Sequence, residues 1–289
     1  MMTSKEQDGD RQLFLVEWAH IHTDFQLSEV ASVLDMEHLV EHCIVHPLPR
    51  QNFEPCSFCD FYAKLRQTTN NEEIDTHRSF LIISLPIQLD NQSSSEKLIT
   101  ALSRCALVRG VIELWAADEE LDLCAQKIRI MVQPQEVSQS ENNLHHPLIQ
   151  KHCMDANMSW KMTIATLGSK YTREEQNEMR LKFSNHLPFA GPVLMDEPTN
   201  EFVLIREIEL DHKGSPLYPR HASKSEIIPE NDARPPLAVY FGRTLGSGRN
   251  LREEWEKFKL KNRVYLGPTS MDSELSMVMT NLAQVSNQV

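Results

Sequence analysis

Two cysteines and their neighbours form one set of side chains in this sequence that could do chemistry. Cys56 and Cys59 are separated by two residues, and His42, Cys43 and His46 precede them closely. Thiolates and imidazoles at such spacing could hold a zinc ion. A second pair of cysteines at this spacing is missing, and the intervening LPRQNFEP is typical of a turn. We therefore favour free thiols and predict no metal site.

A glycine-rich turn is the second candidate for chemistry. Gly242, Gly246 and Gly248 lack the Lys-Ser/Thr ending of a phosphate loop, and their spacing differs from that of a dinucleotide fingerprint. A strand-to-helix turn that needs positive φ explains them better. No Ser/His/Asp or Cys/His set is recognisable by spacing, so we assign no catalytic residue to this chain.

Basic residues gather near the end of the chain. Residues 239–263 hold seven Lys/Arg against three Glu, whereas the remainder holds 22 Lys/Arg against 38 Asp/Glu. A local reversal of sign on an acidic protein is typical of a surface that binds a polyanion. A solvated helix face would give the same pattern, and charge alone leaves both interpretations open.

Composition places the chain among globular proteins. Its 289 residues are 40% hydrophobic and carry a net charge of −12, so contact with nucleic acid must be local. The polar N-terminus resembles neither a signal peptide nor an anchor, and no apolar run approaches the length of a membrane span, so we expect no membrane contact. Six scattered cysteines fit a reducing compartment, and we expect a cytoplasmic protein.

The elements needed to position these residues form an α+β pattern. The order strand–helix–strand–strand–helix–strand is that of a ferredoxin-like domain. Its strands are expected at Leu13–Trp18, Phe58–Leu65, Phe80–Ile87 and Val111–Trp115. Its two helices are expected after Asp24 and after a capping box of Ser93 and Glu96.

A second set of elements follows a polar segment that lacks periodicity. A strand is expected near Trp160, a helix after the capping box of Thr172 and Glu175, and two further strands at Phe202–Leu210 and Ala238–Phe241. The terminal helix repeats apolar residues from Met271 to Val285, and the sequence offers this stripe no partner. The expected segments are a disordered N-terminus at 1–12, a ferredoxin-like domain at 13–132, a linker at 133–158, a second α+β domain at 159–243, and basic and amphipathic helices at 244–289.

Several short motifs, in register over residues 13–285, resemble one family. They are RCALVRG at 104–110 with ELW at 113–115, LPFAGPV at 187–193, YFGR at 240–243, LKNR at 260–263 and GPTSMD at 267–272. Together they are similar to the catalytic subunit of eukaryotic tRNA guanosine-10 N2-methyltransferases. The resemblance implies that residues 159–243 form a THUMP-like RNA-binding domain, with tRNA as partner. In the complete family member it also implies S-adenosylmethionine as cofactor and a small zinc-binding activator subunit.

The catalytic motifs of that family are absent from these residues. Neither its acidic-Pro-Phe-x-Gly-x-Gly motif for the cofactor nor its Asp-Pro-Pro-Tyr motif occurs. We therefore expect the Rossmann-like methyltransferase domain to be missing, no cofactor in this chain, and no methylation by it. Lys261-Asn262-Arg263 replaces the family's Lys-Lys-Arg, which removes one positive charge.

Seven basic residues are predicted to contact tRNA phosphates, which would fix register without reading sequence. They are Arg104, Arg109, Lys170, Arg243, Lys257, Lys261 and Arg263. For Arg104 and Arg109, compensation of a helix dipole is an equal alternative. Three functions remain open: the docking part of the methyltransferase, an inert tRNA binder, and a protein-interaction module that uses the terminal helix.

Overall fold

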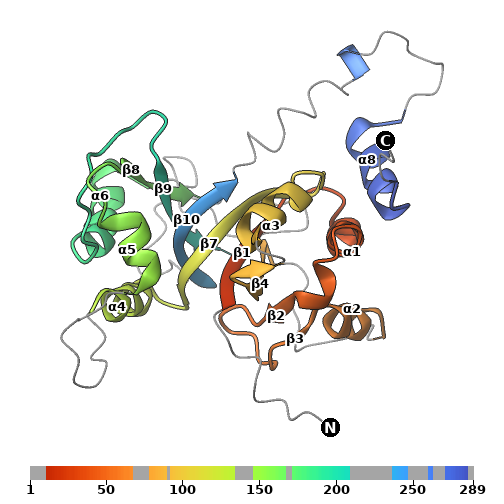
Figure 1. The fold of residues 1–289 in the computed structure, drawn as a ribbon, viewed down its shortest axis with the longest axis horizontal. Coiled ribbons are helices and arrows are strands. Elements are labelled where there is room, and N and C mark those ends of the chain that lie inside the picture. The colour runs from red at the N-terminus through yellow and green to blue at the C-terminus, as the bar shows by residue number, and fades with distance from the viewer. Residues whose placement is uncertain are drawn as a thin grey trace, which may run out of the picture. The chain divides into compact units, whose positions relative to one another are not determined.

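The computed structural model describes residues 11–67, 78–89, 92–133, 146–166, 171–208, 236–246, 260–262 and 271–285. The chain forms two compact units (Figure 1). Unit 1 holds Met1–Glu113 together with Leu245–Val289, and unit 2 holds Leu114–Thr244. The division therefore falls inside strand β7 (Val108–Asp118) and not in the polar segment 133–158.

Unit 1 contains an antiparallel sheet in the order β3-β2-β4-β1-β7. Its strands are β1 (Arg11–Trp18), β2 (Ile44–His46), β3 (Cys56–Ser57), β4 (Phe80–Pro86) and the first part of β7, and β5 (Gln88–Leu89) pairs separately with β6 (Gln92–Ser93). Its helices are η1 (Thr23–Phe25), α1 (Gln26–Met36), η2 (Val40–His42), α2 (Phe58–Gln67), α3 (Ser94–Leu102), η5 (Leu260–Asn262) and α8 (Ser273–Leu282). In β1, Phe14, Leu15 and Val16 are completely buried, which places this strand in the core.

The strand expected at Phe58–Leu65 is the helix α2, and β2 (Ile44–His46) supplies the second strand of the predicted ferredoxin-like order instead. Phe58, Phe61 and Leu65 recur at helical spacing, and the first two are buried in the core of unit 1. Ser57 caps this helix, because its Oγ accepts a hydrogen bond from the Asp60 N–H at 3.1 Å. Helical periodicity and the cap together decide the structure of this segment.

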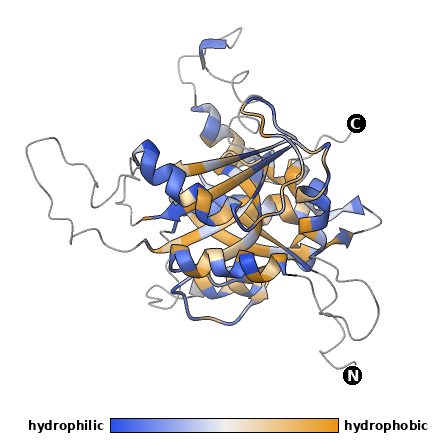
Figure 2. Ribbon diagram, turned by 90° about the vertical axis from the view of Figure 1, so that its left-hand side faces the viewer, coloured by the Kyte–Doolittle hydropathy of each residue, from blue (hydrophilic) through white to orange (hydrophobic). Residues whose placement is uncertain are grey.

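Unit 2 is built on the sheet order β7-β10-β9-β8. Strands β8 (Trp160–Thr166) and β9 (Asn200–Glu207) are parallel, and β10 (Ala238–Gly246) is antiparallel to β9. Its helices are α4 (Leu121–Val132), α5 (Pro147–Cys153) and α6 (Arg173–Ser184). Figure 2 shows the strands largely in apolar colours and the helices with mixed faces. The α+β fold class predicted from the sequence is confirmed.

The structure confirms one of the two capping boxes that the sequence predicts. The capping box of Thr172 and Glu175 is formed in full. The one expected at Ser93 is not, because Ser93 Oγ bonds Ser95 Oγ instead of the helix N-terminus. The expected linker at 133–158 contains α5, which begins with a proline in its first turn and buries Ile149 and Cys153.

The terminal helix α8 has a partner within unit 1, so the predicted unpartnered stripe is wrong. Val278 is completely buried and packs with Ala106 and Leu107. Helix α8 also contacts α1, about 250 residues earlier in the chain. A contact between segments so distant in sequence leaves no periodic signal that a single sequence could show.

Candidate nucleic-acid interface

Two of the seven predicted phosphate ligands lie in unit 1 with acidic neighbours. Arg104 follows α3, donates to the Val285 carbonyl at 2.9 Å, and lies 3.9 Å from Glu37 Oε1. Arg109 lies on β7 with 55% of its side chain exposed, 3.4 Å from Glu17 Oε1. Burial raises the pKa of Glu17, and Arg109 opposes that rise. Arg104 thus has a structural role at the end of α8, whereas Arg109 presents its charge to solvent.

Two further candidates lie on described segments. Lys261 is exposed in η5, in unit 1. Arg243 is half-buried on β10 of unit 2, paired in register with Phe202 of β9. The other three predicted residues, Lys170, Lys257 and Arg263, lie outside the described residues. Arg109 and Lys261 are therefore the described candidates that are clearly open to an RNA in unit 1.

The segment LPFAGPV forms a tightly held loop in unit 2. Trp160 stacks on Phe189 with ring centroids 3.9 Å apart, and its Nε1 donates to the Gly191 carbonyl at 3.1 Å. Backbone hydrogen bonds join Trp160 to Pro192 and to Leu194. A Cβ on Gly191 would lie 2.0 Å from the Met158 carbonyl oxygen, so only glycine fits here.

Glu29 and Asn281 are residues that sequence reasoning missed. Both are completely buried. Glu29 accepts hydrogen bonds from the backbone N–H groups of Ala106 and Leu107 and from Asn281 Nδ2, all within 2.9 Å. Asn281 Nδ2 also donates to the Arg104 carbonyl at 2.8 Å. This network fixes α8 against α1 and the loop that carries Arg104.

The six cysteines are all free thiols. Burial raises the pKa of Cys43 to about 12, which keeps this thiol protonated and unreactive. Among the described residues, no three His, Cys, Asp or Glu side chains gather as metal ligands would. Within the same residues, no helix is both long and apolar enough to cross a bilayer.

Comparison with known proteins identifies similar sequences. The family model described as the Tmrp11 THUMP N-terminal domain matches residues 70–250. The mouse protein "tRNA (guanine(10)-N(2))-methyltransferase TRMT11" is 25% identical over 219 residues, which are 76% of this chain and 39% of that protein. The Saccharomyces cerevisiae protein "tRNA (guanine(10)-N(2))-methyltransferase" is 27% identical over 213 residues, which are 74% of this chain and 40% of that protein. The chain thus spans about 40% of the length of these relatives.

Two solved structures show a distant likeness. One is the crystal structure of PH1313 from Pyrococcus horikoshii, with a TM-score of 0.37, 8% identity, and coverage of 80% of this chain and 54% of that one. The other is a 4-thiouridine synthetase–RNA complex with bound ATP, with a TM-score of 0.33, 8% identity, and coverage of 81% and 42%.

Proposed function

The chain belongs to the family of the Tmrp11 THUMP N-terminal domain, and from that premise we propose that it is the tRNA-docking part of a tRNA guanine-N2 methyltransferase. The observation that carries this proposal is the match of the family model to residues 70–250. Relatives in mouse and yeast are named as methyltransferases of guanine 10, which supports tRNA as the partner.

The chemistry of the proposed enzyme lies outside the residues of this chain. S-adenosylmethionine would supply the methyl group in the complete enzyme, but the acidic-Pro-Phe-x-Gly-x-Gly and Asp-Pro-Pro-Tyr motifs do not occur here. A small zinc-binding activator subunit and a cytoplasmic location complete the proposal, and the free cysteines are compatible with that location.

Docking would act through phosphate contacts that fix the register of the tRNA. Arg109 and Lys261 are exposed in unit 1 and can meet phosphates without breaking the core. Each such contact releases condensed counterions, so affinity should fall as salt rises. Positioning of this kind can contribute several kcal/mol to a reaction without any group that transfers protons, up to about 7–11 kcal/mol for well-oriented reactants.

Binding of the chain to tRNA over a series of salt concentrations tests the proposal. We expect affinity to fall with salt, and the double variant Arg109→Gln, Lys261→Gln to reduce the slope of log affinity against log salt by about two, roughly one per lost contact. Lys127→Gln removes one equally exposed charge, on α4 of unit 2, from a residue that is not among the predicted phosphate contacts, so it should change the slope little. Affinity that does not respond to salt, or an equal effect of the control, would contradict the proposal.

The protein-interaction alternative loses its main support. It depended on a bare apolar stripe along the terminal helix, and Val278 in that stripe is buried against Ala106 and Leu107. An inert tRNA binder would show the same salt dependence as the methyltransferase part. A methylation assay distinguishes the two functions. If the chain is the docking part of a methyltransferase, joining it to the family's catalytic sequence should support methylation of guanine 10, whereas an inert binder should not.

A further inference from the structure

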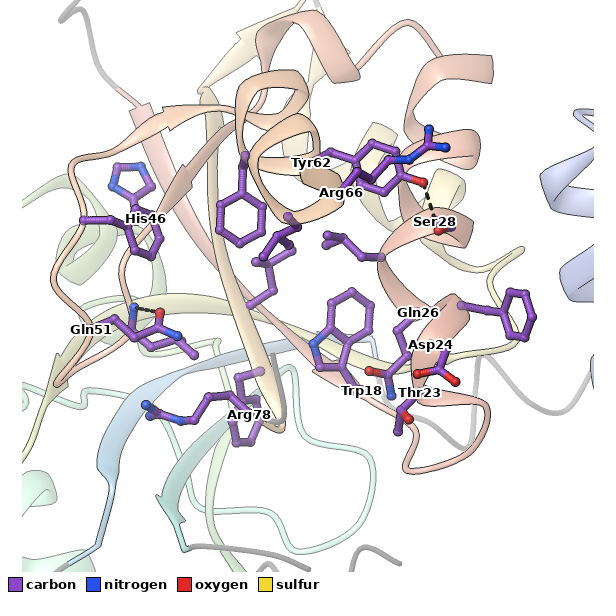
Figure 3. Close-up of a pocket in the computed structure, with 18 of the residues that line it drawn as sticks. Trp18, Thr23, Asp24, Gln26, Ser28, His46, Gln51, Tyr62, Arg66 and Arg78 are labelled. Atoms are coloured by element: carbon purple, nitrogen blue, oxygen red, sulfur yellow. Dashed lines mark hydrogen bonds between the residues drawn. The ribbon is translucent and has the colours of Figure 1, made fainter. Parts of the chain in front are cut away.

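A pocket of about 570 Å³ opens in unit 1 (Figure 3), and neither Arg109 nor Lys261 is among the residues that line it. Helices α1, α2 and α8, the 3-10 helix η1 and strands β1, β2 and β4 all contribute side chains to its wall. Its volume lies within the range of about 300–1,000 Å³ that is usual for small-molecule sites. Leu282 of α8 lines it, so docking of the terminal helix completes the wall.

Six aromatic rings line the pocket. They are Trp18, Phe25, Phe53, Phe61, Tyr62 and Phe80. Trp18, Phe61 and Phe80 are buried in the wall, whereas Phe25 is 42% exposed and stands at the edge. The Tyr62 hydroxyl and Ser28 Oγ are 2.9 Å apart, which links α2 to α1 and orients the Tyr62 ring. Flat rings fixed in this way suit the stacking of another planar ring.

The net charge of the lining is positive, whereas the net charge of the whole chain is negative. The lining includes two arginines, Arg66 and Arg78, and one carboxylate, Asp24, in a chain whose net charge is −12. Burial, and then Arg11, lowers the pKa of His46, so this side chain is neutral at pH 7. The Arg66 guanidinium lies 5.7 Å from the centre of the Tyr62 ring. The lining is therefore prepared for a ligand that carries negative charge.

Polar atoms for the edge of a planar ligand are also present. Gln26 is buried, and its Nε2 donates to the Ala19 carbonyl at 2.6 Å, which fixes the orientation of its amide. Its amide oxygen can then accept a hydrogen bond from a ligand N–H. The Asp24 carboxylate and Thr23 hydroxyl line the same pocket (Figure 3). Acceptors beside stacking surfaces are the arrangement that proteins use for unpaired bases.

We propose that this pocket holds one unstacked nucleobase together with its phosphate. The base would stack among Trp18, Phe25 and Tyr62 with its amino or imino N–H directed to Gln26, and the phosphate would meet Arg66. The base belongs either to an unpaired nucleotide of an RNA or to a free nucleotide, because both present the same chemistry. In its RNA form this inference rests on the proposed tRNA docking.

Binding of the full chain to tRNA and to each of the four nucleoside monophosphates tests the pocket. Arg66→Gln should lower affinity about threefold to tenfold through loss of a phosphate contact. Phe25→Ala should lower it by about fivefold or more through loss of stacking. The matched controls are Lys64→Gln, which removes the same charge from an exposed position of α2 outside the pocket, and Ile87→Ala, which removes an exposed apolar side chain elsewhere. Both controls should retain affinity within about twofold of wild type, as surface changes usually do.

The outcomes separate the pocket from the docking function. Weaker tRNA binding in both pocket variants, without nucleotide binding, supports a base held within an RNA. Nucleotide binding that both pocket variants weaken, with no tRNA binding by wild type, supports a free-nucleotide site while the proposed docking function fails. Pocket variants that behave like their controls towards every ligand would overturn the inference, even if salt-dependent tRNA binding persisted.

Discussion

Glu29 has no exposed surface, and its carboxylate accepts three hydrogen bonds from two loop N–H groups and from Asn281. Burial raises its pKa above the ordinary value of 4.5, and the three hydrogen bonds oppose that rise without cancelling it. The native protein therefore binds this proton more tightly than the unfolded chain does. Stability contributed by the group must fall as pH rises from 4.5 through the raised native value.

Glu29→Gln, which imitates the protonated carboxyl group, removes this titration. As pH rises from 4.5 through the raised native pKa of Glu29, wild type loses stability that the variant keeps. We therefore expect the free energy of unfolding of the variant to increase relative to that of wild type over this range. The gain is about 1.4 kcal/mol for each unit by which the native pKa exceeds the unfolded one. Urea unfolding at a series of pH values measures it. Glu17, whose pKa is also raised, remains in both proteins and so cancels in the difference.

The exposed Glu41→Gln provides the control, since its side chain is 70% exposed. This surface change should alter the free energy of unfolding by no more than about 0.5 kcal/mol. A wild-type advantage over Glu29→Gln that grows with pH would show that the carboxylate is the favoured native form, and would contradict the prediction.

At the scale of single elements, helix α8 offers a comparison between two adjacent residues. Val278 is completely buried, whereas Met279 is 52% exposed. Val278→Ala removes two buried carbon groups and should lower the free energy of unfolding by about 1.6 kcal/mol before any cavity forms, whereas Met279→Ala should change it by less than about 0.5 kcal/mol. Hydrogen exchange should accelerate along α8 in the first variant. Equal effects of the two changes would show that α8 is not docked in solution.

The sequence predicts elements well where one local signal is strong and nothing competes with it. The strand at Phe80–Pro86 and the helix after Thr172 are both confirmed, since the first is rich in β-branched residues and the second has its capping box. It fails at Phe58–Leu65, where aromatic content competes with helical spacing. It also misses α5, because a seven-residue helix that starts at a proline lies within a polar segment.

The candidate site was less predictable than the fold, for a physical reason. Basic composition identifies Arg109 and Lys261 but cannot show that Arg104 is engaged with Val285 and Glu37. The pocket combines residues between Trp18 and Leu282 that no spacing rule connects. Such sites form only after distant segments pack, so a single sequence holds no local sign of them.

At the scale of the whole molecule, the two units have separate cores. Among the described residues, the buried cluster around Phe14 and Ile83 shares no member with the cluster around Phe202 and Phe241. Hydrophobic packing acts over contact distances, so a defect in one core should lower the stability of its own unit first. Unit 2 offers a suitable place for such a defect at Gly191.

Gly191→Ala tests this division. Its added Cβ would meet the Met158 carbonyl oxygen at 2.0 Å, and overpacking of this kind destabilises by about 1–3 kcal/mol. We expect hydrogen exchange to accelerate in β8 and β9 while β1 and β4 keep wild-type protection. Ala190→Ser, at the exposed neighbouring position, should leave both sets unchanged. If β1 and β4 lost protection together with β8 and β9, the chain would unfold as one cooperative body, and a docking function could not be assigned to either unit separately.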